Sequence, residues 1–247
     1  MDRMIYVAMS GAQHILDQQA VVANNLANVS TTGYRAAASA FRAVPAQGEG
    51  LATRTFVVDS TPGADFAPGA LQSTGRNLDV AVQGKGWIAV QASDGSEAYT
   101  RNGNLQVSAN GLLQTRDGLN VAGESGPIAI PADSDVTIAS DGTVSAVSIV
   151  PPPNAVNAVG RIKLVNPNEA QLVRGDDGLF RLAGGGSAEA DPKVALASGM
   201  LESSNVDPVQ EMISMISLAR QFDLQMKLLS SADNNAQAAS QILSVNA

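Results

Sequence analysis

The most extended apolar periodicity of the chain lies at its C-terminal end, between Asp207 and Asn246. Apolar and small residues recur there at alternating spacings of three and four, which is the period of a coiled-coil seam. Asp207 is a favourable N-cap, Pro208 suits the first helical position, and Gln210 completes a capping box. The pattern predicts a helix whose apolar side packs on a partner along Met215, Leu218, Phe222, Leu229, Ala236 and Leu243.

A second apolar periodicity covers residues 3–28, with heptad positions that include Ile5, Ala12, Ile15, Val22 and Leu26. Between Met4 and Tyr34 the only formally charged side chain is Asp17, and beyond Lys227 the only one is Asp233. Exposed helices normally carry many charges. Because both ends share the same period and the same scarcity of charge, we expect them to pair with each other and with copies of the chain.

The segment from residue 76 to about residue 200 has the pattern of an all-β domain. Asn-Gly and Asp-Gly dipeptides separate its short apolar runs, and such dipeptides supply the positive φ that tight hairpin turns require. These predicted turns are Asp94-Gly95, Asn102-Gly103, Asn110-Gly111, Asp117-Gly118, Asp141-Gly142 and Asp177-Gly178.

Residues 36–75 read as a connector, because proline and glycine interrupt them repeatedly. One strand is expected at Thr53–Val58, and the Ala-rich opening of the connector could extend a helix by a turn or two. The predicted fold class is therefore α+β, in which long N- and C-terminal α-helices (1–35 and 204–247) form a discontinuous coiled-coil domain. The connector (36–75) leads from it to an inserted all-β, hairpin-rich domain (76–203).

Composition removes several classes of function. The 247 residues include 15 basic and 23 acidic side chains, a net charge of −8, so the basic stripe of a nucleic-acid-binding protein is missing. The chain has no cysteine, which excludes disulfides and thiolate metal sites. No apolar run approaches the roughly 20 residues of a membrane span. The N-terminus lacks the apolar core of a cleaved signal peptide, so we expect a cytoplasmic protein or one exported without such a signal.

Catalysis and metal binding have weak candidates. His14 is the only histidine, and Ser10 and Asp17 lie about one helical turn on either side of it, which suggests a hydrolase as one alternative. No nucleophile elbow accompanies these residues, so a polar position on an assembly helix is the better interpretation. A carbohydrate- or calcium-binding β module on a helical oligomerisation stalk is a second alternative, although the EF-hand pattern is absent. We expect no catalytic residues, no cofactor, no metal site and no small-molecule substrate.

Three parts of the chain resemble the bacterial flagellar rod and hook proteins. The N-terminal part reads ANNLAN at 23–28 and TGYR at 32–35, and the central part reads LDVAVQG at 78–84 and YTRNG at 99–103. The C-terminal part reads GMLESSNVDP at 199–208. The opening twelve residues are similar to proximal-rod members of the family, and a distal-rod member is the alternative.

This resemblance implies a structural subunit of the basal-body rod, which polymerises through its terminal helices into a torque-transmitting shaft. Its implied partners are copies of itself, other rod subunits and, during secretion, the flagellar type III export apparatus. Its implied location is the periplasmic rod, without direct membrane insertion.

Overall fold

The computed structural model describes residues 2–45, 55–149 and 156–245. The chain divides into two compact units, and both are discontinuous in sequence. Unit 1 comprises Met1–Asn28, Ala36–Asp65 and Val206–Ala247, and unit 2 comprises Val29–Arg35 and Phe66–Asn205. The predicted domain boundaries at residues 35, 75 and 203 stay predictions.

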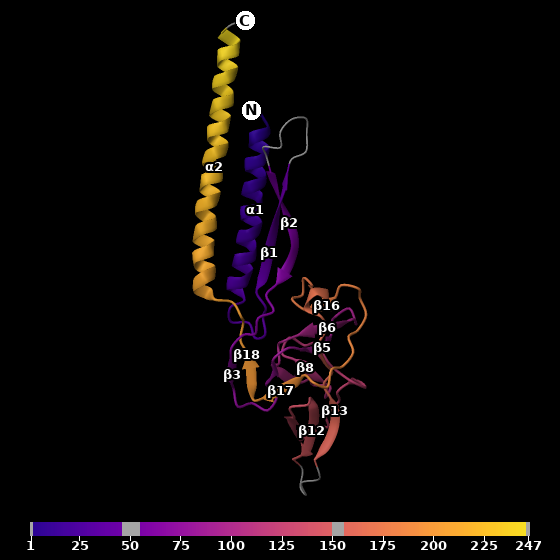
Figure 1. Cartoon of the computed structure of the whole chain (residues 1–247). Helices are drawn as coiled ribbons and strands as arrows, with labels where there is room; N and C mark the ends of the chain where they lie inside the picture. Colours follow the sequence, from indigo (N-terminus) through magenta and orange to yellow (C-terminus); the bar gives the residue numbers. More distant parts are fainter. Residues whose placement is uncertain (1, 46–54, 150–155, 246–247) are drawn as a thin grey trace. The chain divides into compact units, whose positions relative to one another are not determined.

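Unit 1 contains two helices and one antiparallel hairpin among its described residues. The helices are α1 (Asp2–Ala27) and α2 (Pro208–Val245), and the hairpin pairs β1 (Ala37–Pro45) with β2 (Thr55–Ala64). Figure 1 shows α1 between α2 and the hairpin. The start of α2 is fixed as predicted, because Asp207 Oδ1 accepts hydrogen bonds from the main-chain N–H groups of Val209 (2.9 Å) and Gln210 (3.2 Å).

The prediction that the terminal helices form a coiled-coil domain is wrong, whereas the α+β class fits. The buried contact between the helices is one short cluster, in which Ile15, Val22 and Leu218 are buried and Met215 and Phe222 pack against them. A coiled coil would instead continue its interlocking seam along both helices. The physical reason for the difference is that α1 has a second neighbour, because the β1–β2 hairpin covers another of its sides.

The Ala-rich opening of the predicted connector forms strand β1 and not further helical turns. Its residues pair with β2 in an antiparallel register that runs from Ala37 opposite Ala64 to Pro45 opposite Thr55. Alanine favours helix, but hydrogen bonding to β2 and packing against α1 outweigh this preference of a few tenths of a kcal/mol per residue. The strand predicted near Phe56 corresponds to β2, whereas Thr53 and Arg54 lie outside the described residues.

Unit 2 is built from short antiparallel strands. The largest sheet has the order β15-β16-β6-β5-β9-β8-β7, with β10 paired to β9 and β14 paired to β5. A three-stranded sheet has the order β11-β12-β13, and the pairs β17–β4 and β18–β3 form two further small sheets. The bounds are β3 (Leu71–Ser73), β4 (Val80–Gln83), β5 (Trp87–Gln91), β6 (Glu97–Thr100), β7 (Leu105–Val107), β8 (Leu113–Thr115), β9 (Asn120–Gly123), β10 (Gly126–Pro127), β11 (Ser134–Ile138), β12 (Thr143–Ser148), β13 (Asn157–Arg161), β14 (Leu164–Val165), β15 (Leu172–Arg174), β16 (Phe180–Leu182), β17 (Ala195–Ser198) and β18 (Met200–Glu202), with a 3₁₀ turn at Glu169–Gln171.

One continuous apolar core joins the largest sheet, the three-stranded sheet and the β17–β4 pair of unit 2. It includes Ile88 and Val90 of β5, Val136 of β11, Val144 of β12 and Leu196 of β17, all of them buried. Five of the six predicted turn glycines have φ between 75° and 87°, as tight turns require. Gly103 is the exception, because it has no positive φ, and a Cβ atom there would lie 1.7 Å from the carbonyl oxygen of Val80. The glycine at 103 is needed for close packing and not for a hairpin turn.

Candidate functional site

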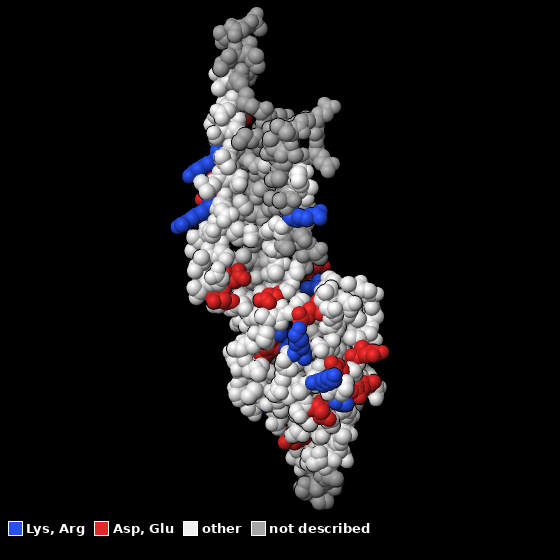
Figure 2. Space-filling view, viewed as in Figure 1, with Lys and Arg blue, Asp and Glu red and all other residues white. Residues whose placement is uncertain are grey.

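The outward side of α2 carries a row of exposed apolar side chains, which we call the outer face of α2: Val209, Met212, Ile213, Ile216 and Leu224. Each of them is between 53% and 64% exposed. In Figure 2 most atoms drawn along this helix are uncharged, although a few basic side chains project from its outward edge. Clusters of exposed large apolar residues are unusual on a monomer and indicate an interaction surface.

The residues that the sequence predicted to form the assembly contacts do not belong to this outer face, and those whose side chains are described are buried or half-buried. Ala12, Ile15, Val22 and Leu218 are buried, and four more are half-buried: Leu26, Met215, Phe222 and Leu229. The structure brings Ile15, Val22, Met215, Leu218 and Phe222 together in the cluster between α1 and α2. The side chains of Ile5, Ala236 and Leu243 lie outside the described part of the chain. That these positions also carry contacts between subunits stays a prediction.

Asn25 joins three elements of unit 1. It is 3% exposed, and its Nδ2 donates to the carbonyl oxygen of Ala37 (3.0 Å) and to Glu211 Oε1 (2.9 Å). Its Oδ1 accepts the N–H of Ala37 at 2.8 Å. One buried amide therefore connects the end of α1 to the start of β1 and to the first turn of α2.

Replacing Asn25 by Ala is expected to lower the free energy of unfolding of unit 1 by about 2–3 kcal/mol, because the N–H of Ala37 loses its acceptor in a buried site. Urea unfolding followed by helical circular dichroism measures this, since α1 and α2 both belong to unit 1. The matched control is Gln13→Ala in the same helix, whose exposed side chain should matter by less than about 0.5 kcal/mol. Equal losses in both variants would contradict the role of Asn25.

Unit 2 contains a buried cluster of three charged side chains, which we call the 35–101–202 cluster. Glu202 Oε1 lies 2.7 Å from Arg35 Nη2, and Glu202 Oε2 lies 3.0 Å from Arg101 Nη1. The three side chains are between 0% and 4% exposed. Glu202 Oε1 also accepts the N–H of Gly69 at 2.9 Å. One carboxylate is thus shared by two guanidinium groups away from water.

Main-chain carbonyl groups and one aromatic ring complete this cluster. Arg35 Nη1 donates to the carbonyl oxygen of Ala67 (2.8 Å), and Arg101 Nη2 donates to that of Gly84 (2.7 Å). The Arg101 guanidinium lies 5.3 Å from the ring centre of Trp87. Burial lowers the pKa of Arg101, and the negative charge of Glu202 opposes this shift. The cluster has a structural role, because its three charged groups pair with one another inside the fold.

Sequence reasoning did not find Asn25, Arg101 or Glu202 as contact residues. Asn25 lies three positions after Val22 in the apolar stripe of the first helix, and a polar residue at such a position was a usable signal. Arg101 and Glu202 are separated by about a hundred residues, and nothing in the local pattern connects them. Their pairing is visible only in the folded chain.

The proposed hydrolase pair does not form a catalytic arrangement. The Ser10 hydroxyl donates to the carbonyl oxygen of Val7 in its own helix at 2.8 Å. The His14 ring packs edge-on against Phe41 of β1, with ring centres 5.7 Å apart. Within the described ranges no three His, Asp or Glu side chains are grouped so that they could hold a metal ion. No helix in those ranges is long and apolar enough to cross a membrane.

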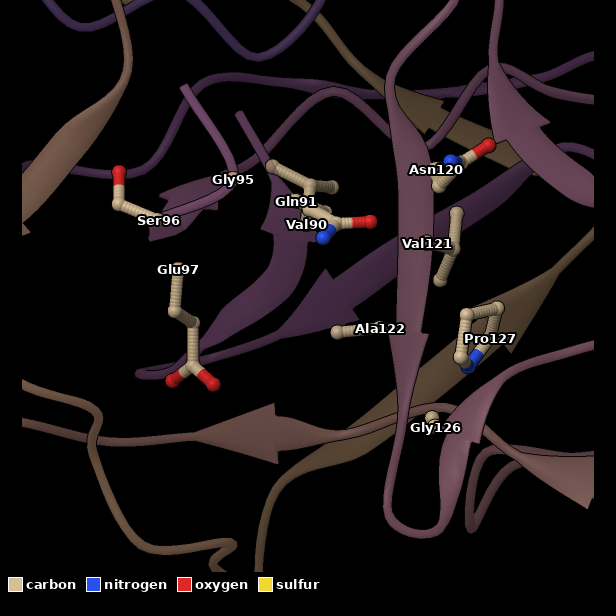
Figure 3. Close-up of a pocket in the computed structure, with 11 residues that line it drawn as sticks. Val90, Gln91, Gly95, Ser96, Glu97, Asn120, Val121, Ala122, Gly126 and Pro127 are labelled. Carbon is tan, nitrogen blue, oxygen red and sulfur yellow. The ribbon is translucent and has the colours of Figure 1, made fainter. Parts of the chain in front are cut away.

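A pocket of about 250 Å³ opens in unit 2 between the β5–β6 turn and the β9–β10 hairpin. Figure 3 shows Gln91 between the stretch Ser96–Glu97 and strand β9. The carboxylate of Glu97 in this pocket is already paired, because Lys163 Nζ donates to its two oxygens at 3.0 and 2.8 Å. The Ser96 hydroxyl likewise donates to Asp94 Oδ1 at 2.6 Å. These side chains are held by their neighbours within the fold and form no nucleophile–base pair.

Comparison with known families gives three matches along the chain. Residues 5–35 match the family described as flagella basal body rod protein. Residues 81–146 match the flagellar hook protein FlgE/F/G D1 domain, and residues 197–242 match the flagellar basal body rod FlgEFG protein C-terminal family. Arg35, Arg101 and Glu202 fall one in each matched segment, so the buried cluster ties together the three parts of the chain that these families describe.

Curated relatives match over the whole length. The flagellar basal-body rod protein FlgF of Salmonella typhimurium is 53% identical over 252 residues, covering 100% of both chains. FlgF of Caulobacter vibrioides is 34% identical, covering 96% of this chain and 95% of the relative. The flagellar basal-body rod protein FlgG of Agrobacterium fabrum is 33% identical, covering 98% and 99%.

Proposed function

This chain belongs to the family of flagellar basal-body rod proteins, and on that premise we propose that its terminal helices carry its contacts with neighbouring rod subunits. It is a structural subunit of the rod. Its similarity to FlgF proteins over their full length supports a position in the proximal rod. The observation that carries the proposal is the exposed outer face of α2.

The outer face of α2 supplies the driving force for assembly. Burying one large apolar side chain contributes about 1.5–3 kcal/mol, and five such side chains are exposed along this face. The cluster around Leu218 holds α1 on the opposite side of α2, so the outer face is available to other subunits. A heterologous contact of this kind, repeated from copy to copy with a rotation that does not close on itself, builds a helical assembly.

Other rod subunits and copies of this chain are the partners within the rod, and the flagellar export apparatus is the partner during secretion. Segments 1–35 and 204–247 act as the assembly domain, 36–75 as a connector and 76–203 as the β domain. The predicted seam positions, from Ile5 to Leu243, contribute to the helical contacts. The role is mechanical transmission of torque and not catalysis.

Replacing Ile216 by Asp tests the proposal. Ile216 is 56% exposed, so the variant should keep its fold, whereas a charge placed in a contact between subunits is strongly unfavourable. We expect the variant protein to be missing from isolated basal bodies and the cells to lose motility. Unchanged helical circular dichroism and unchanged Trp87 fluorescence of the purified chain show that both units remain folded.

Ile216→Leu is the matched control, because it keeps the apolar character of the site, and it should support motility. Normal incorporation of the Asp variant would refute the assignment of this face. Loss of motility in both variants would show that the site tolerates no change of shape, and the apolar contact would then be the wrong explanation for the effect.

A further inference from the structure

Two Asn-Gly dipeptides occur in the sequence, at 102–103 and 110–111. In such a dipeptide the main-chain nitrogen of Gly can attack the side-chain amide carbon of Asn, because glycine has no Cβ to obstruct the approach. We propose that Asn110 is a site of spontaneous succinimide formation and deamidation in this protein, and that the fold protects Asn102 from the same reaction.

The reaction at Asn110 needs only water. The nitrogen of Gly111 forms a bond to Cγ of Asn110, the bond from Cγ to Nδ2 breaks, and ammonia leaves with the proton of the Gly111 amide. Water then opens the succinimide ring. Cleavage next to the side-chain carbonyl gives aspartate, and cleavage next to the main-chain carbonyl gives isoaspartate, whose main chain is one carbon longer.

The surroundings of Asn110 leave this reaction accessible. Asn110 is exposed at the tip of the β7–β8 hairpin, and none of the described residues forms a hydrogen bond with its amide group. The attacking nitrogen is held by one hydrogen bond, from the N–H of Gly111 to the carbonyl oxygen of Ser108 at 2.9 Å. A single turn bond at a hairpin tip opens readily.

The surroundings of Asn102 oppose the same reaction. Its Nδ2 donates to Asp117 Oδ2 at 3.0 Å, and its Oδ1 accepts the N–H of Asn104 at 3.1 Å. Gly103 is buried, a Cβ atom there would lie 1.7 Å from the carbonyl oxygen of Val80, and its own carbonyl oxygen accepts the N–H of Val80 at 2.9 Å, so the main chain at this position is held in place. Several contacts must break together before the ring can close.

Three of the four Asp-Gly turns could form the same succinimide by losing water, but the structure disfavours it. Asp94 Oδ1 accepts the N–H of Ser96 (2.9 Å), Asp141 Oδ1 accepts the N–H of Thr143 (3.0 Å), and Asp177 Oδ1 accepts the N–H of Leu179 (3.1 Å). The pKa of each of these three carboxyl groups is lowered, for Asp94 chiefly by the Ser96 hydroxyl, for Asp141 by the N–H of Thr143 and for Asp177 by the Arg181 guanidinium, and this keeps them ionised. A carboxylate is a poor target for nucleophilic attack, so we expect Asn110 to react faster than Asp94, Asp141 and Asp177.

An isoaspartate at 110 would disturb more than the hairpin tip. The carbonyl oxygen of Gly111 accepts the N–H of Ile130 at 2.7 Å, and the N–H of Ser108 donates to the carbonyl oxygen of Leu112 at 2.8 Å. The longer main chain of isoaspartate shifts Gly111 relative to both contacts. The modification therefore adds a negative charge and loosens one edge of the large sheet.

The experiment incubates the purified full-length chain in mildly alkaline buffer, folded and in parallel in concentrated urea. Proteolytic peptides are then analysed by mass spectrometry for the exchange of an amide for a carboxyl group. In the folded chain we expect Asn110 to react at least about tenfold faster than Asn102, because several hydrogen bonds hold the side chain of Asn102, whereas the amide of Asn110 has none among the described residues and one turn bond holds the N–H of Gly111. In urea the two rates should become similar, since both sites have the same local sequence signal.

The Asn110→Gln variant is the control, because its longer side chain closes the corresponding six-membered ring much more slowly, and most of the modification of the folded chain should disappear. Similar rates at the two sites in the folded chain would overturn the proposal. A rate at Asn110 that folding suppresses as strongly as the rate at Asn102 would overturn it as well.

Discussion

Replacing Glu202 by Gln is expected to lower the free energy of unfolding of unit 2 by about 3–5 kcal/mol, because removing one partner of a buried ion cluster leaves uncompensated charge. Gln keeps the shape of the side chain and an oxygen for the N–H of Gly69. What it removes is the negative charge that faces Arg35 and Arg101, both of which are nearly inaccessible to water. Arginine cannot respond by losing its proton.

Fluorescence of Trp87 during urea unfolding measures this effect in unit 2. Trp87 is the only tryptophan in the chain, it is 3% exposed, and it lies beside Arg101. The matched control is Glu169→Gln, which breaks the ion pair with Lys85 at 3.1 Å on the surface. Exposed pairs of this kind contribute at most about 1 kcal/mol. If the two variants lost the same free energy of unfolding, the 35–101–202 cluster would contribute no more to the stability of unit 2 than a surface ion pair.

Replacing Gly33 by Ala is expected to lower the free energy of unfolding of unit 2 by at least about 3 kcal/mol. The substitution strains the backbone, creates a steric overlap and breaks a hydrogen bond. Gly33 has φ +68°, and a Cβ atom there would lie 2.3 Å from the carbonyl carbon of Arg101. The segment must move away, which breaks the bond from the N–H of Gly33 to the carbonyl oxygen of Glu202 (2.8 Å). Arg35, two residues later, is then displaced from the buried cluster.

Gly75 provides a control with nearly the same backbone and no overlap. Its φ is +69°, and a Cβ atom there meets nothing within 4 Å. Gly75→Ala should therefore cost only the strain of the left-handed conformation, about 1–2 kcal/mol. The difference between the two variants, again followed by Trp87 fluorescence, isolates the overlap with Arg101. A difference near zero would mean that the segment relaxes without losing its contacts.

Local signals in the sequence predicted several features correctly. The cap at Asp207 follows from the hydrogen-bonding capacity of one side chain, and the structure confirms both of its bonds. Five predicted turn glycines adopt positive φ, because a tight turn between two strands allows few other residues there. The α+β class and the two helices follow from the period of the apolar residues. Each of these features depends on neighbours within a few positions of the chain.

The wrong expectations concern competition between local preference and distant partners. The heptad pattern predicted a coiled coil, but α1 also packs against the β1–β2 hairpin, and the pattern contains no information about that second neighbour. The Ala-rich segment from Ala37 favours helix by itself, yet it forms a strand because β2 pairs with it in an antiparallel register from Ala37 to Pro45, with one shift between Ala38 and Ala40. Glycine at 103 suggested a turn, whereas its reason is the nearby carbonyl oxygen of Val80.

The sequence by itself determined where helices begin, where turns occur and which faces are apolar, since these depend on interactions between residues close along the chain. Only the tertiary structure decided that Arg35, Arg101 and Glu202 meet, that Asn25 joins three elements, and that the described positions of the predicted seam are buried or half-buried in unit 1 while the outer face of α2 stays exposed. The physical reason is the separation along the sequence between the residues that interact. A buried charge or amide is stable only when its partners are present, and the fold brings those partners from segments up to nearly 190 residues away, a separation over which the local pattern carries no signal.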